Sequence, residues 1–150
     1  MIFRQAARVV IVDKMGRALL LRGFDPARPD EHYWFTVGGG IDPGETSVDA
    51  AIRELLEEIG LSVEPVRLGQ PIFRGEVFFT FDGQNYHQEQ VFYALSIGVL
   101  GDEMEIISTG REDIEQRTID AHRWWSIEEI ENTAEVIYPA ELPDLLRFLG

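Results

Sequence analysis

Apolar runs separated by short polar breaks predict strands in the first part of the chain. The runs at 6–13 and 17–24 are separated by Lys-Met-Gly, which favours a hairpin of two buried strands. Residues 25–31 contain two prolines and alternating charges, so we expect a loop there. A short aromatic strand is expected at 32–36. The three glycines at 38–40 follow it, and they allow a close backbone approach that side chains would block.

A helical period begins after these glycines and continues to about residue 59. Thr46 or Ser47 can cap its start, and Gly60 stands where a left-handed residue commonly closes a helix. Apolar residues at steps of three and four predict the buried stripe, which comprises Val48, Ala51, Ile52, Leu55 and Ile59. The charged positions lie opposite this stripe or on its flank, and they are Arg53, Glu54, Glu57 and Glu58. We therefore expect an amphipathic helix with an acidic outer face.

The second half of the chain is richer in strands. The stretches 66–81 and 86–97 are joined through Asp-Gly, a dipeptide typical of hairpins. Residues 98–119 are acidic and weakly patterned, and we expect a loop. The last expected elements are a strand at 121–125, a helix capped by Ser126 and Glu129, and a short helix at 139–149. This irregular order predicts an α+β fold with a mixed sheet and helices packed on it.

Length and composition are typical of one globular domain over residues 1–150. Cysteine is absent, which excludes disulfides, thiolate nucleophiles and cysteine-based zinc sites. The histidines His32, His87 and His122 are widely separated, so we interpret them as surface or packing residues rather than zinc ligands. No apolar run approaches the length of a membrane span, and we expect a cytoplasmic protein. The net charge of -14 disfavours bulk nucleic-acid binding.

Three carboxylates on the expected helix are the main candidates for chemistry. Glu54, Glu57 and Glu58 are three and four residues apart, so their oxygens can converge on a hard divalent cation. Like charges this close repel one another unless a cation is present. The alternative interpretation is an ordinary solvated acidic face.

The spacing around these carboxylates matches the pattern G-x5-E-x7-R-E-U-x-E-E-x-G-U, in which U is a bulky aliphatic residue. The matching residues are Gly39, Glu45, Arg53, Glu54, Leu55, Glu57, Glu58, Gly60 and Leu61. This is the Nudix box, and the chain resembles Nudix hydrolases. The resemblance extends to the strand pair before the box, to Trp34 with the glycine run, and to the Trp-Trp-Ser junction at 124–126. It implies a Nudix-type α/β/α sandwich with a mixed central sheet and the box helix packed on it.

The resemblance also implies an activity and its residues. Relatives hydrolyse a diphosphate linkage in a nucleoside diphosphate linked to another moiety, by water attack at phosphorus with Mg²⁺, for which Mn²⁺ can substitute. The implied metal ligands are Glu54, Glu57, Glu58 and a backbone carbonyl of the glycine run, from Gly39 or Gly38. Arg53 and Glu45 are expected to orient the catalytic carboxylates, and Glu57 is a candidate general base. Val37 replaces the proline that many relatives carry before the glycines, which alters loop rigidity more than chemistry.

Residues outside the box are weaker candidates. Glu115 is the first choice for an added ligand or base from the acidic loop, ahead of Glu112 and Asp113, and a solvated role is the alternative for each. Arg22 corresponds to the family's phosphate-contacting basic residue, or is a solvated charge at a strand end. Trp34 is named as a substrate contact, although aromatic residues in strands more often belong to the core.

Two functions remain open at this level. The first is a pyrophosphohydrolase acting on a small nucleotide-type substrate, such as a nucleoside triphosphate or a nucleotide sugar. The second is a sensor of the same fold that binds a nucleotide without cleaving it. The complete set of three glutamates favours the enzyme, because a sensor has no chemical need for all of them. The box does not identify the substrate, and a homodimer is compatible with these features.

Overall fold

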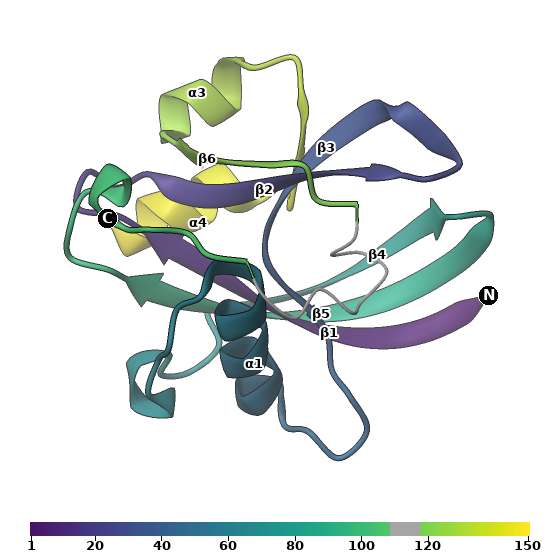
Figure 1. The fold of residues 1–150 in the computed structure, drawn as a ribbon, viewed down its shortest axis with the longest axis horizontal. Coiled ribbons are helices and arrows are strands. Elements are labelled where there is room, and N and C mark those ends of the chain that lie inside the picture. The colour runs from purple at the N-terminus through teal and green to yellow at the C-terminus, as the bar shows by residue number, and fades with distance from the viewer. Residues whose placement is uncertain (109–117) are drawn as a thin grey trace.

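A computed structural model describes residues 1–108 and 118–150 of the chain (Figure 1). Its strands are β1 (Ile2–Val12), β2 (Ala18–Asp25), β3 (Arg28–Gly40), β4 (Phe73–Phe81), β5 (Gln84–Ser96), β6 (Ala121–Trp125) and β7 (Val136–Tyr138). Its α-helices are α1 (Ser47–Ile59), α3 (Ile127–Asn132) and α4 (Leu142–Leu149), and the 3-10 turns η1 (Pro65–Arg67) and η2 (Gly101–Glu103) complete the order. None of the helices in the described ranges is long and apolar enough to cross a membrane.

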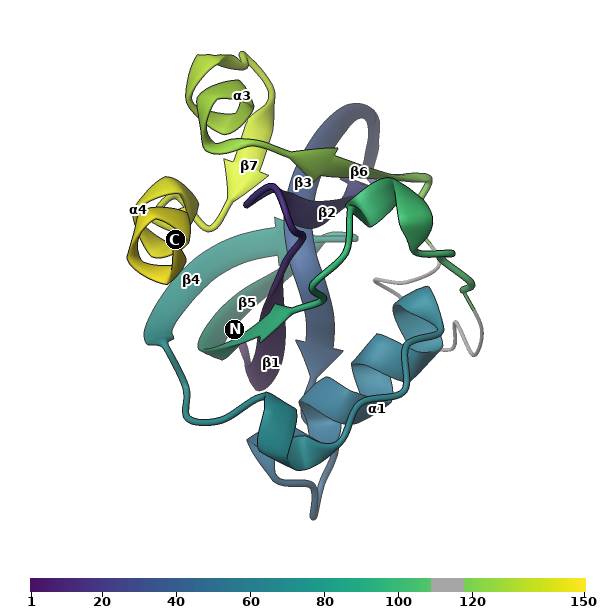
Figure 2. The same cartoon turned by 90° about the vertical axis from the view of Figure 1, so that its left-hand side faces the viewer.

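The strands form one mixed, curled sheet in the order β4-β5-β1-β2-β3-β7, and β6 pairs with β2. Two pairings are parallel, β1 with β5 and β3 with β7, and the others are antiparallel. Strand β1 also pairs with the glycine end of β3, where Arg8 lies opposite Gly38. Helix α1 lies on one side of this assembly and α3 and α4 on the other (Figures 1 and 2). The predicted α+β sandwich with a mixed sheet is confirmed.

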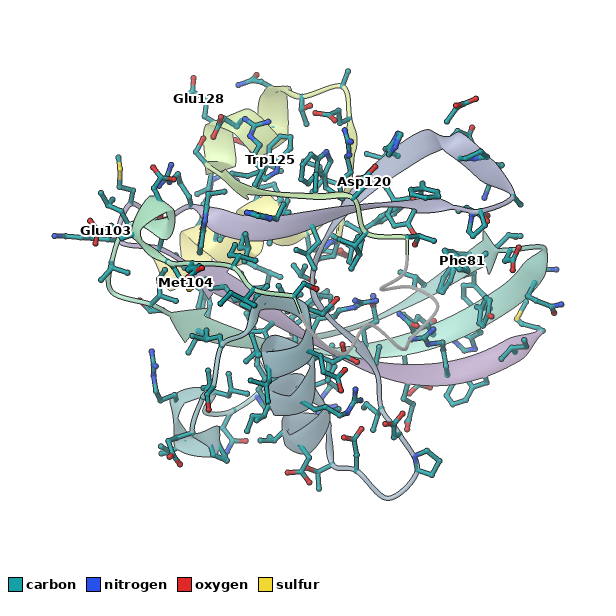
Figure 3. All side chains as sticks on the ribbon, viewed as in Figure 1. Phe81, Glu103, Met104, Asp120, Trp125 and Glu128 are labelled. Atoms are coloured by element: carbon teal, nitrogen blue, oxygen red, sulfur yellow. The ribbon has the colours of Figure 1, made fainter. Side chains whose placement is uncertain are left out.

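The apolar run in β1 serves two cores, because successive side chains of a strand point to opposite faces. Val9 packs in the cluster that contains Leu55 of α1, whereas Val10 packs in the cluster that contains Leu142 of α4. The second cluster also contains Trp125, which lies at the end of β6 close to α3 (Figure 3). Burial on both faces explains why this strand has no polar alternation over its central residues.

The local signals at the helix ends are confirmed. The Thr46 hydroxyl accepts a hydrogen bond from the Asp49 amide at 3.1 Å, and Gly60 closes α1 with φ 74°. At α3 the Ser126 and Glu129 side chains each accept a hydrogen bond from the other residue's backbone N–H. The Thr46 and Ser126 caps satisfy amides that would otherwise have no partner at the first turn, and the Gly60 amide donates to the Leu56 carbonyl at the last turn of α1.

Several expected boundaries are wrong. The loop expected at 25–31 is a tight turn, because the Asp25 carboxylate accepts from the Ala27 amide and pairs with Arg28, so β2 and β3 stay paired almost to the turn. The strand expected from residue 66 begins only at Phe73, after the turn η1. The glycine run belongs to the end of β3, and β7 is an additional strand that its pairing with β3 supports.

Candidate active site

Helix α1 lies with its acidic side against the glycine run, so the expected acidic outer face is wrong for two of its carboxylates. Glu54 and Glu58 are buried. The Gly38 amide donates to Glu58 Oε1 at 2.7 Å, and a Cβ placed on Gly39 would lie 2.6 Å from Glu54 Oε1. A strand without side chains therefore leaves the space that these two carboxylates occupy.

Arg53 joins the other members of the motif into one network. Its Nε donates to Glu45 Oε2 at 2.8 Å, and its Nη2 donates to the Gly40 carbonyl at 2.9 Å. Its Nη1 donates to Glu54 Oε1 at 3.0 Å and to Glu57 Oε2 at 3.2 Å. One guanidinium thus connects the loop before α1, the end of β3 and two carboxylates of α1. Such charge-assisted contacts restrict the orientation of the acids.

Burial and charge shift the acidity of these groups in opposite directions. Burial raises the pKa of the Glu54 carboxyl to about 7, although Arg53 and Arg8 oppose the rise, and the neighbouring Glu57 charge adds to it. By contrast, the hydrogen bond from Arg53 lowers the pKa of Glu45. Without a bound cation, the protein therefore holds a proton on Glu54 more tightly than an unfolded chain does.

The raised pKa of Glu54 predicts a pH dependence of stability in metal-free protein. Between about pH 4.5 and pH 7 the folded state binds more protons than the unfolded state, so unfolding free energy should fall as pH rises through this window. Chemical denaturation at pH 5 and pH 8 in chelator measures the difference, and Glu54→Gln should reduce it because glutamine does not titrate. An identical pH dependence in parent and variant would contradict the assignment.

The three helix carboxylates do not meet at one point. Within residues 1–108 and 118–150, no group of three or more His, Asp or Glu side chains is arranged to hold a metal ion. Glu58 is directed to the Gly38 amide, whereas Glu54 and Glu57 share the Nη1 atom of Arg53. The shared Arg53 atom shows that two of the three carboxylates, Glu54 and Glu57, converge on a single positive charge. That donor chemistry fits a divalent cation.

Two arginines that sequence reasoning missed as site residues lie on the opposite side of the glycine run. A Cβ on Gly38 would lie 2.8 Å from Arg8 Cδ, and one on Gly40 would lie 2.9 Å from Arg4 Nη2. Both arginines are on the same face of β1, and Arg8 is buried. The signal was available in the sequence, because a charged residue in an otherwise buried apolar strand needs a specific partner.

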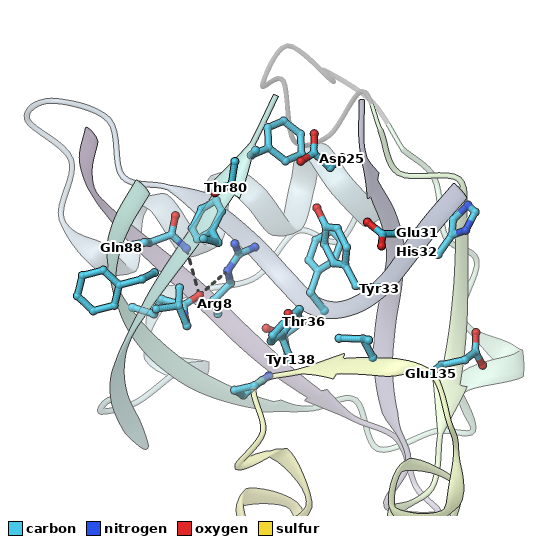
Figure 4. A pocket seen from close by; sticks show the side chains of 18 of the residues that line it. Arg8, Asp25, Glu31, His32, Tyr33, Thr36, Thr80, Gln88, Glu135 and Tyr138 are labelled. Carbon is cyan, nitrogen blue, oxygen red and sulfur yellow. Dashed lines mark hydrogen bonds between the residues drawn. The ribbon is translucent and has the colours of Figure 1, made fainter. Parts of the chain in front are cut away.

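A pocket of about 880 Å³ opens beside Arg8 and lies between the β3 and β7 strands on one side and the β4 and β5 strands on the other (Figure 4). Asp25 connects the two walls, since its Oδ1 accepts from the Asp82 amide at 2.8 Å as well as from the Ala27 amide. Arg28 adds a contact from its Nη2 to the Thr80 carbonyl at 3.5 Å. Because Arg8 lines the pocket and faces Gly38, the pocket and the carboxylate network are neighbours on the two sides of the glycine run.

The weaker sequence candidates lie elsewhere. Arg22 makes two hydrogen bonds to the carboxylate of Asp120, at 2.9 and 3.3 Å, just before β6 (Figure 3). Trp34 is buried in the second core, where its indole N–H donates to Glu135 at 3.0 Å. Neither residue lines the pocket, so the structure favours the packing alternative for Trp34. The acids of the loop, Glu112, Asp113 and Glu115, lie outside the described residues.

A comparison of the sequence with models of known protein families identifies the family of this chain. A family model described as the NUDIX domain matches residues 2–145. The chain belongs to the Nudix hydrolase family. Its members generally use divalent metal ions, which agrees with the hard oxygen donors of α1. The Nudix box of this chain is thus the junction of α1 with the end of β3.

Curated relatives match only part of the chain. An RNA pyrophosphohydrolase of Serratia proteamaculans is 41% identical over 66 residues, which are 44% of this chain and 35% of that protein. The chain therefore matches about a third of the length of this relative.

Solved structures match over the whole fold. The Escherichia coli dihydroneopterin triphosphate pyrophosphohydrolase has a TM-score of 0.68 at 18% identity, and the match covers 99% of this chain and 97% of that one. A Caenorhabditis elegans Ap4A hydrolase has a TM-score of 0.59 at 25% identity, with both chains covered completely. At 18% identity the first likeness shows the shared fold alone.

Proposed function

We propose that this chain is a pyrophosphohydrolase that cleaves a diphosphate linkage in a nucleotide-type substrate, by attack of water at phosphorus, with Mg²⁺ or Mn²⁺. The family membership and the relatives indicate this class of enzyme. The observation that carries the proposal is the arrangement around the glycine run. Carboxylates of α1 lie on one side of it, Arg4 and Arg8 lie on the other, and Arg8 lines a pocket large enough for a nucleotide.

The metal ligands in this proposal are Glu54, Glu57, Glu58 and a backbone carbonyl of Gly39. A divalent cation held there would neutralise phosphate charge and activate water. The convergence of Glu54 and Glu57 on Arg53 supports this assignment, because the same oxygens already accept a shared positive charge. Binding of the cation would also relieve the repulsion between carboxylates that burial intensifies.

The residues of the chain then have distinct tasks. Glu57 is the most exposed of the three helix glutamates, with 29% of its side chain accessible, so its carboxylate can take a proton from the attacking water. The water oxygen bonds to phosphorus while the bridging P–O bond breaks, and the leaving phosphate departs with the electron pair. Arg53 and Glu45 position the carboxylates. Arg4 and Arg8 can pair with phosphate oxygens, which arginine does in a bidentate manner.

A release assay over a panel of compounds tests the proposal. The panel should contain nucleoside triphosphates, nucleotide sugars, ADP-ribose, Ap4A, dihydroneopterin triphosphate and 5′-triphosphorylated RNA, each with Mg²⁺, with Mn²⁺ and with excess chelator. We expect cleavage of at least one compound only when the metal is present. Turnover in chelator would contradict the metal requirement, and binding of a nucleotide without any cleavage would identify a sensor of the same fold.

A further inference from the structure

The pocket contains a buried amide whose acceptor atom has no partner. Gln88 on β5 is 1% exposed, lines the pocket, and its Oε1 accepts no hydrogen bond in the part of the chain that the structure describes. A buried acceptor without a partner is costly, since it has lost its hydrogen bonds to water. A ligand donor can satisfy such an atom in a pocket wall after a small shift of the side chain, because the atom has almost no accessible surface in this structure.

The orientation of this amide follows from its neighbours. Arg8 Nε, which can only donate, lies 3.4 Å from Gln90 Oε1, and this contact identifies the Gln90 oxygen. Gln88 Nε2 donates to the same oxygen at 3.2 Å (Figure 4). If the Gln88 amide were reversed, two carbonyl oxygens would face each other. The chain of contacts from Arg8 through Gln90 therefore leaves Gln88 with its acceptor directed away from Gln90.

The remaining lining restricts the kind of ligand. Aromatic side chains in the lining of the pocket include Tyr33, Phe35, Phe79, Phe81 and Tyr138. Aromatic faces are suited to flat rings, including nucleobases. Arg8 lines the pocket and faces Gly38, whereas Glu54 lies against Gly39 on the other side of the glycine run. A ligand in the pocket can therefore place its ring near β5 and its phosphates toward the glycine run.

We propose that Gln88 is a specificity-determining residue, which accepts a hydrogen bond from a ring or exocyclic N–H of a nucleobase in the pocket. Gln90 is a positioning residue that keeps the Gln88 oxygen available. The inference rests on the proposed function for the nucleotide class of the ligand, but it does not require cleavage. A base without any N–H should lose this contact and leave the acceptor unsatisfied.

Nucleoside monophosphate binding in chelator tests this role without catalysis. The probes are AMP, GMP, CMP and UMP, together with purine riboside 5′-monophosphate and pyrimidin-2-one riboside 5′-monophosphate, which carry no N–H on the base. We expect the parent protein to bind at least one natural monophosphate more tightly than its matched analogue, by about 5- to 100-fold in Kd. Gln88→Met should remove most of this difference by weakening only the natural nucleotide.

Gln84→Met is the matched control, because it makes the same change at an exposed position of the same strand. It should leave every Kd unchanged. Equal weakening of natural and N–H-free nucleotides by Gln88→Met would assign the residue to packing and overturn the proposal. The proposal is also overturned if the parent protein binds no monophosphate, or binds natural and N–H-free nucleotides equally well. This second comparison uses the parent protein alone, so it does not depend on the folding of a variant. If discrimination is found but no compound of the panel is cleaved, the catalytic proposal fails and this one stands.

Discussion

Replacing Glu57 with glutamine is expected to lower the rate of hydrolysis by about 10²- to 10⁴-fold, the range for a positioned acid or base. Glutamine keeps the size of the side chain but can neither take a proton nor supply a charged ligand. The fold should persist, because the Glu57 side chain is partly exposed and is not among the buried residues of α1. Initial rates on a substrate that the parent cleaves, together with thermal unfolding, measure both effects.

The control for Glu57 is Glu64→Gln, the same change at an exposed residue beyond the end of α1. Its turnover should equal that of the parent. Near-parent turnover of Glu57→Gln would show that this carboxylate is outside the chemistry. The base would then have to be sought in Glu54, Glu58 or the acids of the 109–117 segment.

The second large effect is expected from Arg53→Ala, which removes the contacts to Glu45, Glu54, Glu57 and the Gly40 carbonyl together. Loss of hydrogen bonds to charged groups should lower the unfolding free energy by about 2 kcal/mol or more. Turnover should also fall, because the carboxylates lose the group that orients them. Mn²⁺ should raise the melting temperature of the variant more than that of the parent, since the cation replaces the missing positive charge between Glu54 and Glu57.

Arg67→Ala is a suitable comparison, because Arg67 is an exposed residue whose guanidinium donates to the Ser96 carbonyl. It should cost little stability and respond to Mn²⁺ as the parent does. An Arg53→Ala protein with parent-like stability and no added response to Mn²⁺ would argue against both the network and the metal site.

The sequence predicted α1 well because its signals are local. Thr46, Gly60 and the apolar stripe lie within one turn of the positions that they control, so no knowledge of other segments was needed. The hairpin of β1 and β2 and the capping box of α3 follow for the same reason. The Nudix box supplied the grouping of Glu45, Arg53, Glu54 and Glu57, and the structure brings these residues together.

The burial of Glu54 and Glu58 could not be predicted from the helix alone. Periodicity assigns a charged residue to the solvent side, and only the position of the glycine strand against α1 reverses this assignment. The pocket could not be predicted from local patterns, because its residues meet only when distant segments pair. Arg8 and Gln90 come from strands that are adjacent in the sheet, but they are 82 residues apart in the sequence. Trp34 was ambiguous for a related reason, since a core indole and a ligand-facing indole have the same local pattern.

The hydrogen bond from the Asp82 amide to Asp25 restricts how far the pocket can open for a ligand. The β2–β3 turn and the β4–β5 hairpin are held together at one corner, so the two walls cannot separate there without breaking this hydrogen bond. A preorganised opening reduces the ordering cost of association. It also fixes the width of the pocket at that corner. Compounds with a bulky group at this end should then be rejected by shape, whatever their affinity for the phosphate-binding side.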